Sequence, residues 1–170
     1  MNKYLLSIDQ GTTSSKVVIY DKKFKIIDSL QKEHRQYFPK NGWVEHDALD
    51  IWRDVKLLIS NIIKKNHIKY SQILSIGIAN QRETTVMWNK KNGLPVQRAI
   101  VWQDRRTDSF CKILKKKKLD KKIQKITGLV IDPYFSSTKI KWIIDHNKKA
   151  KKLIKQKNLL FGTIDTWLLW

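Results

Sequence analysis

The first 34 residues constrain the fold most, because three strand-like runs follow one another with only short turns between them. Residues 4–9 form a mainly apolar run, which predicts a strand buried on both faces. Residues 11–13 make a turn, and residues 15–20 are rich in β-branched side chains, which favour a second strand. After a turn at residues 21–23, residues 24–34 predict a third strand. The chain therefore opens with two consecutive hairpins.

The next segment predicts a helical crossover. Asp47 is a favourable N-cap for a helix that runs to about Lys65. The apolar side chains expected on one face of this helix are Leu49, Trp52, Val55, Leu58, Ile59 and Ile62. Residues 73–79 predict the next strand, and because a helix precedes it, this strand should join the sheet in parallel.

The middle of the chain predicts two further strands. Residues 84–88 and residues 94–102 are both strand-like, and Asn92-Gly93 between them is a turn signal.

From about Arg105 the pattern becomes helical. Residues 138–156 carry apolar side chains on one face and lysines on the other, which predicts one solvated amphipathic helix after a loop at residues 128–135. Residues 159–164 predict a last strand, and residues 165–170 the opening of a helix. Because this final run is apolar and lacks a C-cap, we expect the chain to be an amino-terminal piece of a longer protein.

The composition is that of a globular protein with an excess of positive charge. The hydrophobic fraction is 41%, and 35 Lys and Arg residues against 15 acidic ones give a formal net charge of +20. Such a charge raises nucleic acid or an anionic membrane as a partner. The lysines are scattered along the whole chain, so compositional drift toward Lys, Ile and Asn is the preferred explanation. A basic nucleic-acid-binding protein is the less favoured alternative.

The cysteine and histidine content narrows the chemistry. Cys111 is the only cysteine, so no intramolecular disulfide forms, which fits a reducing compartment such as the cytoplasm. The histidines, His34, His46, His67 and His146, lack the spacing of metal ligands, and each is expected to be an ordinary surface or core residue. No run approaches the roughly 20 apolar residues that span a bilayer, so no membrane partner is expected.

The segment at residues 9–16, between the first two strands, is the first candidate site. A tight turn at Gly11 exposes successive main-chain N–H groups, and the hydroxyls of residues 12–14 add donors that can reach phosphate oxygens. Asp9 ends a strand beside them and could hold Mg²⁺ directly or through water. The alternative is a plain hairpin turn, in which Asp9 and the threonines only satisfy main-chain groups.

A second candidate site follows the strand at residues 73–79, where ligands bind in open parallel sheets. Arg82 supplies only hydrogen-bond donors and ionised Glu83 only acceptors, so the pair could hold a small polyol, whose hydroxyls both donate and accept. Trp102 could offer an apolar wall to a carbon chain, and Tyr134 could donate its hydroxyl. The alternatives are a surface Arg–Glu pair, a core tryptophan and a loop tyrosine that caps helices.

Together these segments resemble the glycerol kinases of the FGGY carbohydrate kinase family, as do Phe38-Pro39, residues 42–47 and residues 161–167. The resemblance runs over nearly the whole chain, and residues 80–85 are its most specific part. It implies an actin-like or ribonuclease H-like α/β domain with a mixed sheet flanked by helices. Residues 1–170 would then be an incomplete, C-terminally truncated N-terminal domain, with the second domain absent.

The resemblance also implies an activity, which is transfer of the γ-phosphoryl group of ATP to glycerol, with ATP and Mg²⁺ as cofactors. The positions that match nucleotide-phosphate contacts are Thr12, Thr13, Ser14 and Lys16, and the position that matches the Mg²⁺ contact is Asp9. The positions that match glycerol contacts are Arg82, Glu83, Trp102 and Tyr134.

Two departures from the family pattern limit these expectations. Lys16 stands where the family usually has Arg, so the charge is kept but bidentate geometry toward phosphate is lost. The family's catalytic aspartate corresponds to a position beyond Trp170, so the isolated chain is expected to be inactive unless a second polypeptide completes it. The full-length form is expected to be a homo-oligomer. The alternatives are a nonenzymatic domain that retains polyol or phosphate binding and a kinase for another polyol, which residues 80–85 disfavour.

Overall fold

The computed structural model describes residues 3–170, which form a mixed α/β structure. The chain divides into two compact units. Unit 1 combines the residues before Gln36 with residues 47–81 and residues 164–170, and unit 2 combines residues 36–46 with residues 82–163. That residues 1–170 make up one incomplete domain stays a prediction.

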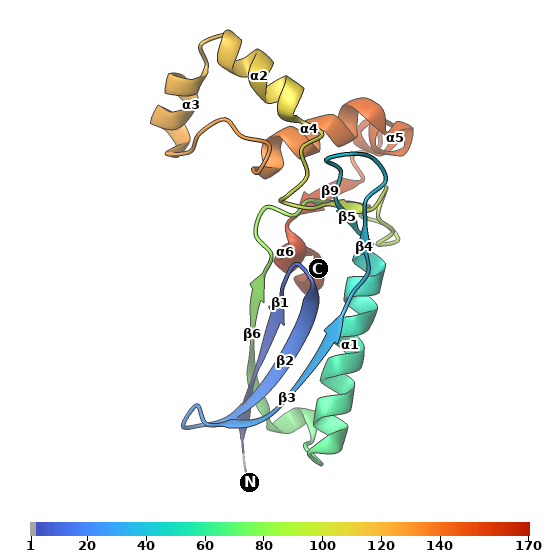
Figure 1. Ribbon diagram of the computed structural model, residues 1–170. Coiled ribbons are helices and arrows are strands. Elements are labelled where there is room, and N and C mark those ends of the chain that lie inside the picture. The colour runs from blue at the N-terminus through green and yellow to red at the C-terminus, as the bar shows by residue number, and fades with distance from the viewer. Residues whose placement is uncertain (1–2) are drawn as a thin grey trace. The chain divides into compact units, whose positions relative to one another are not determined.

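Unit 1 is built on a four-stranded sheet in the order β3-β2-β1-β6 (Figure 1). Strands β1 (Tyr4–Gln10), β2 (Ser14–Asp21) and β3 (Ile26–Glu33) form two consecutive antiparallel hairpins, as predicted. Strand β6 (Ile73–Asn80) pairs in parallel with β1, which confirms the predicted crossover.

The two faces of β1 differ in burial, so the expectation of a strand buried on both faces is wrong. Leu6 and Ile8 are buried, whereas Leu5 and Ser7, which alternate with them, are half-buried. Alternate residues of a strand point to opposite faces, and the register sets Leu6 opposite Ile19 and Ile8 opposite Val17 on the buried face.

Helix α1 (Ala48–Lys65) packs against β2 and β3 on that face. It begins as predicted at Asp47, whose carboxylate accepts a hydrogen bond from the N–H of Leu49 at 2.9 Å. The buried residues of the helix are Ala48, Ile51, Asp54, Val55, Leu58, Ile62 and Ile63. Leu49 and Trp52 are each 42% exposed, so the predicted apolar face was misplaced around the helix at its N-terminal end.

Two short elements complete unit 1. The 3₁₀ turn η1 (Tyr70–Gln72) precedes β6, and helix α6 (Ile164–Leu169) contacts that strand. The indole N–H of Trp167 in α6 donates to the carbonyl of Ala48 at 3.0 Å, which ties the end of the chain to the start of α1. The predicted helix opening after residue 164 is therefore confirmed.

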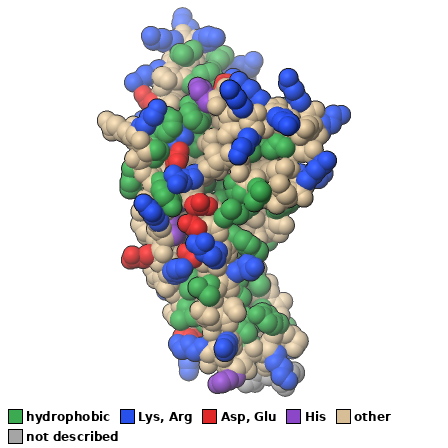
Figure 2. All heavy atoms as spheres, turned by 90° about the vertical axis from the view of Figure 1, so that its right-hand side faces the viewer, with side chains coloured by type: hydrophobic (Ala, Val, Ile, Leu, Met, Phe, Trp, Pro, Cys, Tyr) green, Lys and Arg blue, Asp and Glu red, His purple; other side chains and the backbone are tan. Residues whose placement is uncertain are grey.

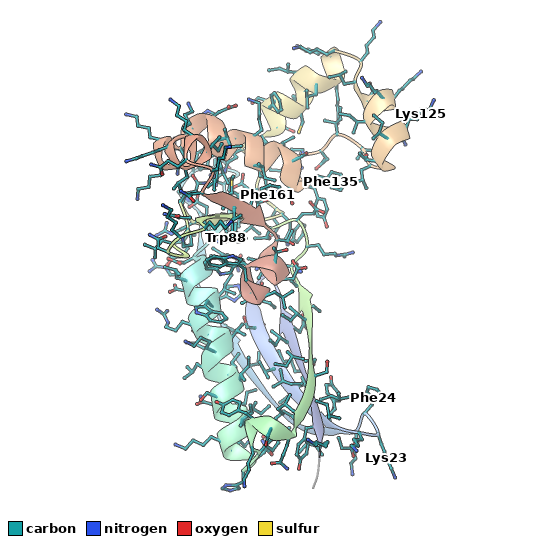
Figure 3. The ribbon with its side chains drawn as sticks, turned by 180° about the vertical axis from the view of Figure 1, so that it is seen from behind. Lys23, Phe24, Trp88, Lys125, Phe135 and Phe161 are labelled. Atoms are coloured by element: carbon teal, nitrogen blue, oxygen red, sulfur yellow. The ribbon has the colours of Figure 1, made fainter. Side chains whose placement is uncertain are left out.

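Unit 2 contains two small sheets. Strands β4 (Gln36–Tyr37), β5 (Glu45–His46) and β8 (Ala99–Ile100) form one, in the order β4-β5-β8. Strands β7 (Val86–Asn89) and β9 (Leu159–Gly162) form the other and run antiparallel. Trp88 on β7 and Phe161 on β9 are labelled in Figure 3; Trp88 is buried and Phe161 is 59% exposed.

The predicted strand at residues 94–102 is mostly irregular, since only its residues 99–100 are a strand. Pro95 lacks an N–H and interrupts the ladder. The two arms around Asn92-Gly93 still touch, because the N–H of Val96 donates to the carbonyl of Met87 at 2.9 Å.

Four helices belong to unit 2, namely α2 (Asp108–Lys116), α3 (Asp120–Thr127), α4 (Ser136–His146) and α5 (Lys148–Lys155). The single helix predicted over residues 138–156 is therefore wrong. Asn147 ends α4 and caps α5, because its side chain accepts from the N–H of Ala150 at 3.0 Å. Helices α4 and α5 contribute Ile143 and Ala150 to a buried core that also contains Met87, Val96 and Ile100.

The basic side chains are spread over the surface. Figure 2 shows Lys and Arg side chains over the whole face in view, interspersed with apolar and acidic groups. Lys23 at the tip of the β2–β3 hairpin and Lys125 on α3 both point away from the chain (Figure 3). Within residues 3–170, no helix combines the length and apolar character that crossing a membrane requires.

Candidate functional site

The predicted site residues fall into two groups, one in each unit. The group in unit 1 surrounds the β1–β2 turn, where the N–H of Gly11 donates to the carbonyl of Ser14 at 2.9 Å. A Cβ atom at Gly11 would lie 3.3 Å from that carbonyl oxygen, which is tighter than most Cβ contacts. Glycine therefore lets the main chain close into the narrow turn that the sequence predicts.

His34 holds this turn from one side. Its ring Nε2 lies 2.9 Å from the carbonyl oxygen of Thr12, and its main-chain N–H donates to the carbonyl of Thr13 at 3.0 Å. Burial lowers the pKa of His34, so the ring is neutral at pH 7, and Nε2 carries the proton because a carbonyl only accepts. In a planar trans peptide the N–H points opposite to the carbonyl, so the N–H of Thr13 faces away from His34.

Two buried glutamines hold the turn as well. The main-chain N–H of Gln81 donates to the carbonyl of Gln10 at 2.7 Å, and its side-chain amide donates to the carbonyl of Gly11 at 3.2 Å. The main-chain carbonyls of residues 10–14 thus all accept from the protein itself, and an anion would instead be bound by N–H groups and hydroxyls of the turn.

The charged residues of the turn lie on one face of the sheet. Asp9 and Lys16 are direct partners in the β1–β2 register, so their side chains project from the same face. Asp9 is exposed and Lys16 is half-buried. The hydroxyl of Ser14 accepts from the side chain of Gln31 at 2.9 Å, which leaves its own proton for donation.

A magnesium ion fits this arrangement only with help from a bound phosphate. Over residues 3–170, no group of three or more His, Cys, Asp or Glu side chains is placed to hold a metal ion. Mg²⁺ commonly takes one or two carboxylates and completes its octahedron with water and phosphate oxygens. Asp9 is a carboxylate of the right kind beside donors suited to phosphate.

The group in unit 2 is organised around Glu83. Glu83 has φ of 65°, a left-handed conformation that costs a non-glycine residue about 1–3 kcal/mol. Its carboxylate oxygen Oε2 accepts from the N–H and the hydroxyl of Ser136, both at 2.8 Å. Its carbonyl accepts from the hydroxyl of Thr85 at 3.2 Å and lies 3.2 Å from the Ser136 hydroxyl, whose single proton is shared between Oε2 and this carbonyl. The surrounding contacts therefore hold a conformation that the residue would not adopt by itself.

The position of Glu83 excludes the surface Arg–Glu pair that the sequence left as an alternative. Ser136 is the first residue of α4, so the Glu83 carboxylate lies at the positive end of that helix. Arg82 is exposed, and among the residues that the structure describes it forms no ion pair with Glu83. The pair is thus not the surface salt bridge that was the alternative.

Trp102 and Tyr134 lie next to each other. Their ring centroids are 5.9 Å apart at an interplanar angle of 68°, and Tyr134 also packs edge-on against Phe135 at 5.1 Å. Phe135 immediately precedes α4 (Figure 3). Trp102 is half-buried rather than a core residue. Its main-chain N–H donates to the hydroxyl of Thr84 at 3.3 Å.

Lys139 connects this aromatic pair to Glu83. Its Nζ donates to the carbonyl of Glu83 at 3.3 Å and to the carbonyl of Tyr134. The sequence placed Lys139 among the solvated lysines of an amphipathic helix, and this is wrong, because the side chain is completely buried. The structure thus brings Glu83, Trp102 and Tyr134 together, with Arg82 exposed next to Glu83 in the chain.

The charged residues that follow Trp102 support the loop that carries it. The guanidinium group of Arg106, whose side chain is 1% exposed, binds Asp104 at 2.8 Å and Glu45 at 2.9 Å. It also lies over the ring of Trp43 at 3.8 Å. A buried arginine shared by two carboxylates and an indole joins the segment of residues 42–47 to the loop that carries Trp102.

Comparison with known proteins finds relatives that match the whole length of this chain. The chain is 53% identical over 170 residues to a glycerol kinase of Bacillus subtilis (strain 168), covering 100% of this chain and 34% of the relative. It is 49% identical over 170 residues to a glycerol kinase of Geobacillus sp. (strain WCH70), with the same two coverages of 100% and 34%. The chain thus spans about a third of the length of the curated relatives it matches.

Solved structures confirm the predicted fold class, an actin-like α/β fold with a mixed sheet. A glycerol kinase of Plasmodium falciparum, solved with ADP, superposes with a TM-score of 0.92 at 38% identity, over 98% of this chain and 33% of that one. A gluconate kinase from Lactobacillus acidophilus shares the fold, with a TM-score of 0.83 at 24% identity over 99% of this chain and 33% of that one.

The family profile described as "FGGY family of carbohydrate kinases, N-terminal domain" matches residues 4–170, which is nearly all of the chain. The match includes both the β1–β2 turn and the group around Glu83. The chain belongs to the FGGY family of carbohydrate kinases.

Proposed function

We propose that this chain supplies the polyol site and the phosphate-binding turn of an ATP-dependent glycerol kinase, which transfers the γ-phosphoryl group of ATP to a terminal hydroxyl of glycerol and forms sn-glycerol 3-phosphate. The observation that carries the proposal is the Glu83 carboxylate, fixed at the start of α4 in one group with Trp102 and Tyr134. The similarity to glycerol kinases at 53% and 49% identity supports glycerol over other polyols.

The polyol site offers complementary groups to a short chain of hydroxyls. The Glu83 carboxylate binds both donors of Ser136 through Oε2, so Oε1 can accept from a substrate hydroxyl. Arg82 and the phenol of Tyr134 donate, and the indole of Trp102 packs against the carbon chain. A substrate fixed in this way presents one hydroxyl for attack in a defined orientation, which lowers the entropic part of the barrier.

The phosphate turn offers donors and a cation to the nucleotide. Its N–H groups and the hydroxyls of Thr12, Thr13 and Ser14 reach phosphate oxygens, and Lys16 adds a positive charge. Asp9 would hold Mg²⁺ directly or through water, and the ion would supply positive charge beside the phosphates. Lys16 acts as a point charge, since an ammonium group lacks the paired donors of a guanidinium.

The complete reaction also needs the catalytic aspartate that the family resemblance places beyond position 170. We propose that this group comes from the two thirds of the relatives' length that the chain does not span, in the same polypeptide or in a second one, and that the whole enzyme is a homo-oligomer. The thiol of Cys111 is free and buried, which fits work in a reducing compartment such as the cytoplasm.

A chimera tests the proposal. Residues 1–170 of this chain replace the aligned third of the Bacillus subtilis glycerol kinase, and ADP release is measured with glycerol, ATP and Mg²⁺. The chimera should turn over glycerol at a rate within the usual enzyme range of about 1–1000 s⁻¹. A chimera with one cooperative unfolding transition but no glycerol-dependent ADP release would contradict the proposal.

The 170-residue polypeptide serves as the matched control. Without the remaining two thirds it should release no ADP under the same conditions, because phosphoryl transfer depends on groups that position and stabilise the phosphoryl from several sides. Turnover of about 1 s⁻¹ or more by this polypeptide would show that it already contains a complete active site.

A further inference from the structure

Lys139 is an unusual residue for the interior of a protein. Its side chain is completely buried, and its ammonium group contacts two main-chain carbonyls, those of Glu83 and Tyr134. Among the described residues, no carboxylate lies within ion-pair distance of its Nζ. It also lies over the ring of Tyr134, 6.0 Å from the centroid.

Burying this cation opposes folding. A charged side chain removed from water loses hydration that hydrogen bonds and distant charges only partly replace. Because burial disfavours the charged form, it lowers the pKa of Lys139 from 10.5 to about 8. Apolar residues of similar volume often stabilise a fold as well as a buried charge does, so stability alone does not account for a lysine here.

The contacts of Lys139 show what the ammonium group adds. Glu83 and Tyr134 come from loops that are far apart in sequence, and Lys139 bonds the carbonyls of both. The hydroxyls of Thr85 and Ser136 also contact the carbonyl of Glu83, but Lys139 is the residue that bonds this carbonyl and that of Tyr134 together. Glu83 has a positive φ, so its side chain direction depends on contacts that hold its main chain.

We infer that Lys139 is a positioning residue of the polyol site, which acts through the main chains of Glu83 and Tyr134. The inference rests on the proposed function, since both residues are assigned there to the polyol. Lys139 itself does not touch the substrate. It sets the distance between an acceptor on one loop and a donor on the other, and this distance selects the length of polyol that can bridge them.

The Lys139→Met variant of the chimera tests the inference, because methionine keeps most of the stem and removes the donors. The KM for glycerol should rise about tenfold or more while the KM for ATP stays within about twofold, as expected when two charge-assisted hydrogen bonds are lost from one site only. Lys141→Met is the control, since Lys141 lies on the same helix, is exposed and contacts Asp145 at 2.6 Å and the ring of Phe110 rather than the polyol group. It should change neither KM.

A pH series on the unaltered chimera gives a second readout if the variant does not fold. As pH rises through about 8, Lys139 loses its charge and its hydrogen bonds weaken, so the KM for glycerol should rise between pH 7 and 9 more than the KM for ATP. The groups that face Lys139 are Glu83, Asp104, Asp132, Cys111 and the ring of Tyr134, with Arg105 and Arg106 paired to the two aspartates.

Titration of these neighbours would not produce the expected rise in the KM for glycerol between pH 7 and 9. Carboxylates and guanidinium groups ordinarily keep their charge between pH 7 and 9, and phenols titrate at about 10. Burial raises the pKa of the Cys111 thiol, which keeps it neutral over most of this range.

The outcomes separate the inference from the proposed function. The positioning role is overturned if Lys139→Met leaves the KM for glycerol unchanged. If that variant does not fold, the role is overturned by equal pH dependence of the KM values for glycerol and ATP. If Glu83→Gln raises the KM for glycerol in the same assay, the polyol site stands without Lys139. If Glu83→Gln leaves it unchanged as well, the proposed function is wrong.

Discussion

The carboxylate oxygen Oε2 of Glu83 accepts hydrogen bonds from both the main-chain N–H and the hydroxyl of Ser136, each at 2.8 Å. This double contact fixes the carboxylate at the N-terminus of α4, where the helix dipole favours negative charge. It also fixes which oxygen faces the protein. Glu83 can therefore present an acceptor in one orientation, as recognition of a small polyol requires.

Ser136→Ala should loosen that orientation. The variant loses the hydroxyl whose single proton is shared between Oε2 at 2.8 Å and the Glu83 carbonyl at 3.2 Å, while the main-chain N–H remains. Hydrogen bonds to charged groups contribute about 1.5–3 kcal/mol, so the KM for glycerol in the chimera should rise about tenfold. The exposed neighbour Ser137→Ala is the control. Equal effects of the two substitutions would mean that the hydroxyl of Ser136 does not orient Glu83.

The stability of the chain should depend on pH through Lys139. The pKa of this group falls from 10.5 to about 8 on folding, so between these pH values the unfolded chain binds the additional proton. Stability then rises with pH over this window, and the penalty of about 3 kcal/mol present at pH 7 disappears by about pH 10.5. Urea unfolding of the 170-residue chain and of Lys139→Met at pH 7–10.5 measures the difference. Parallel curves would contradict a buried charged lysine.

Lys16→Ala should affect the nucleotide and spare the polyol. Lys16 is the partner of Asp9 in the β1–β2 register, and its charge is proposed to meet the ATP phosphates. Loss of one cation from a phosphate site costs about 1–3 kcal/mol, so the KM for ATP should rise tenfold or more at unchanged glycerol KM. Lys23→Ala, at the exposed hairpin tip, is the control (Figure 3). A rise in the KM for glycerol alone would reverse the assignment.

Duplex DNA should bind this chain only weakly, despite the net charge of +20. The basic side chains on the face in Figure 2 are scattered rather than gathered in one stripe. Binding through scattered charge is independent of sequence and falls steeply with salt. Fluorescence anisotropy at 50 and 200 mM salt with two unrelated duplexes measures this. Submicromolar affinity at physiological salt with a preference for one duplex would restore the nucleic-acid alternative.

The sheet of unit 1 was predictable because its signals are local. Apolar runs separated by turns define β1, β2 and β3, and Asp47 marks the start of α1 by its capping chemistry. The break in the helix predicted over residues 138–156 was harder to predict from the sequence than the sheet. Asn147 can end one helix and cap another, but an asparagine within an amphipathic pattern is also tolerated in a continuous helix.

The sequence indicated which residues belong to the candidate sites, but not which contacts hold them in place. Arg82, Glu83, Trp102 and Tyr134 stand out by type, whereas Ser136 and Lys139 are ordinary residues of a helix in sequence. His34 was also taken for an ordinary histidine, although it lies at the end of β3 and contacts Thr12. Predicting the register between β2 and β3 would have placed His34 beside the turn. No local pattern shows that a lysine is buried, because this depends on loops distant in sequence.

Glu83→Gln in the chimera is the most direct test of the central claim, which is that Glu83 binds a polyol hydroxyl. The amide oxygen can keep the contacts with Ser136, so the amide N–H₂ faces the ligand and a substrate donor loses its acceptor. Such a mismatch costs about 1–3 kcal/mol, so kcat/KM for glycerol should fall roughly tenfold to hundredfold with little change for ATP. Glu33→Gln, an exposed carboxylate on β3, is the control. An unchanged glycerol titration for Glu83→Gln would contradict the account.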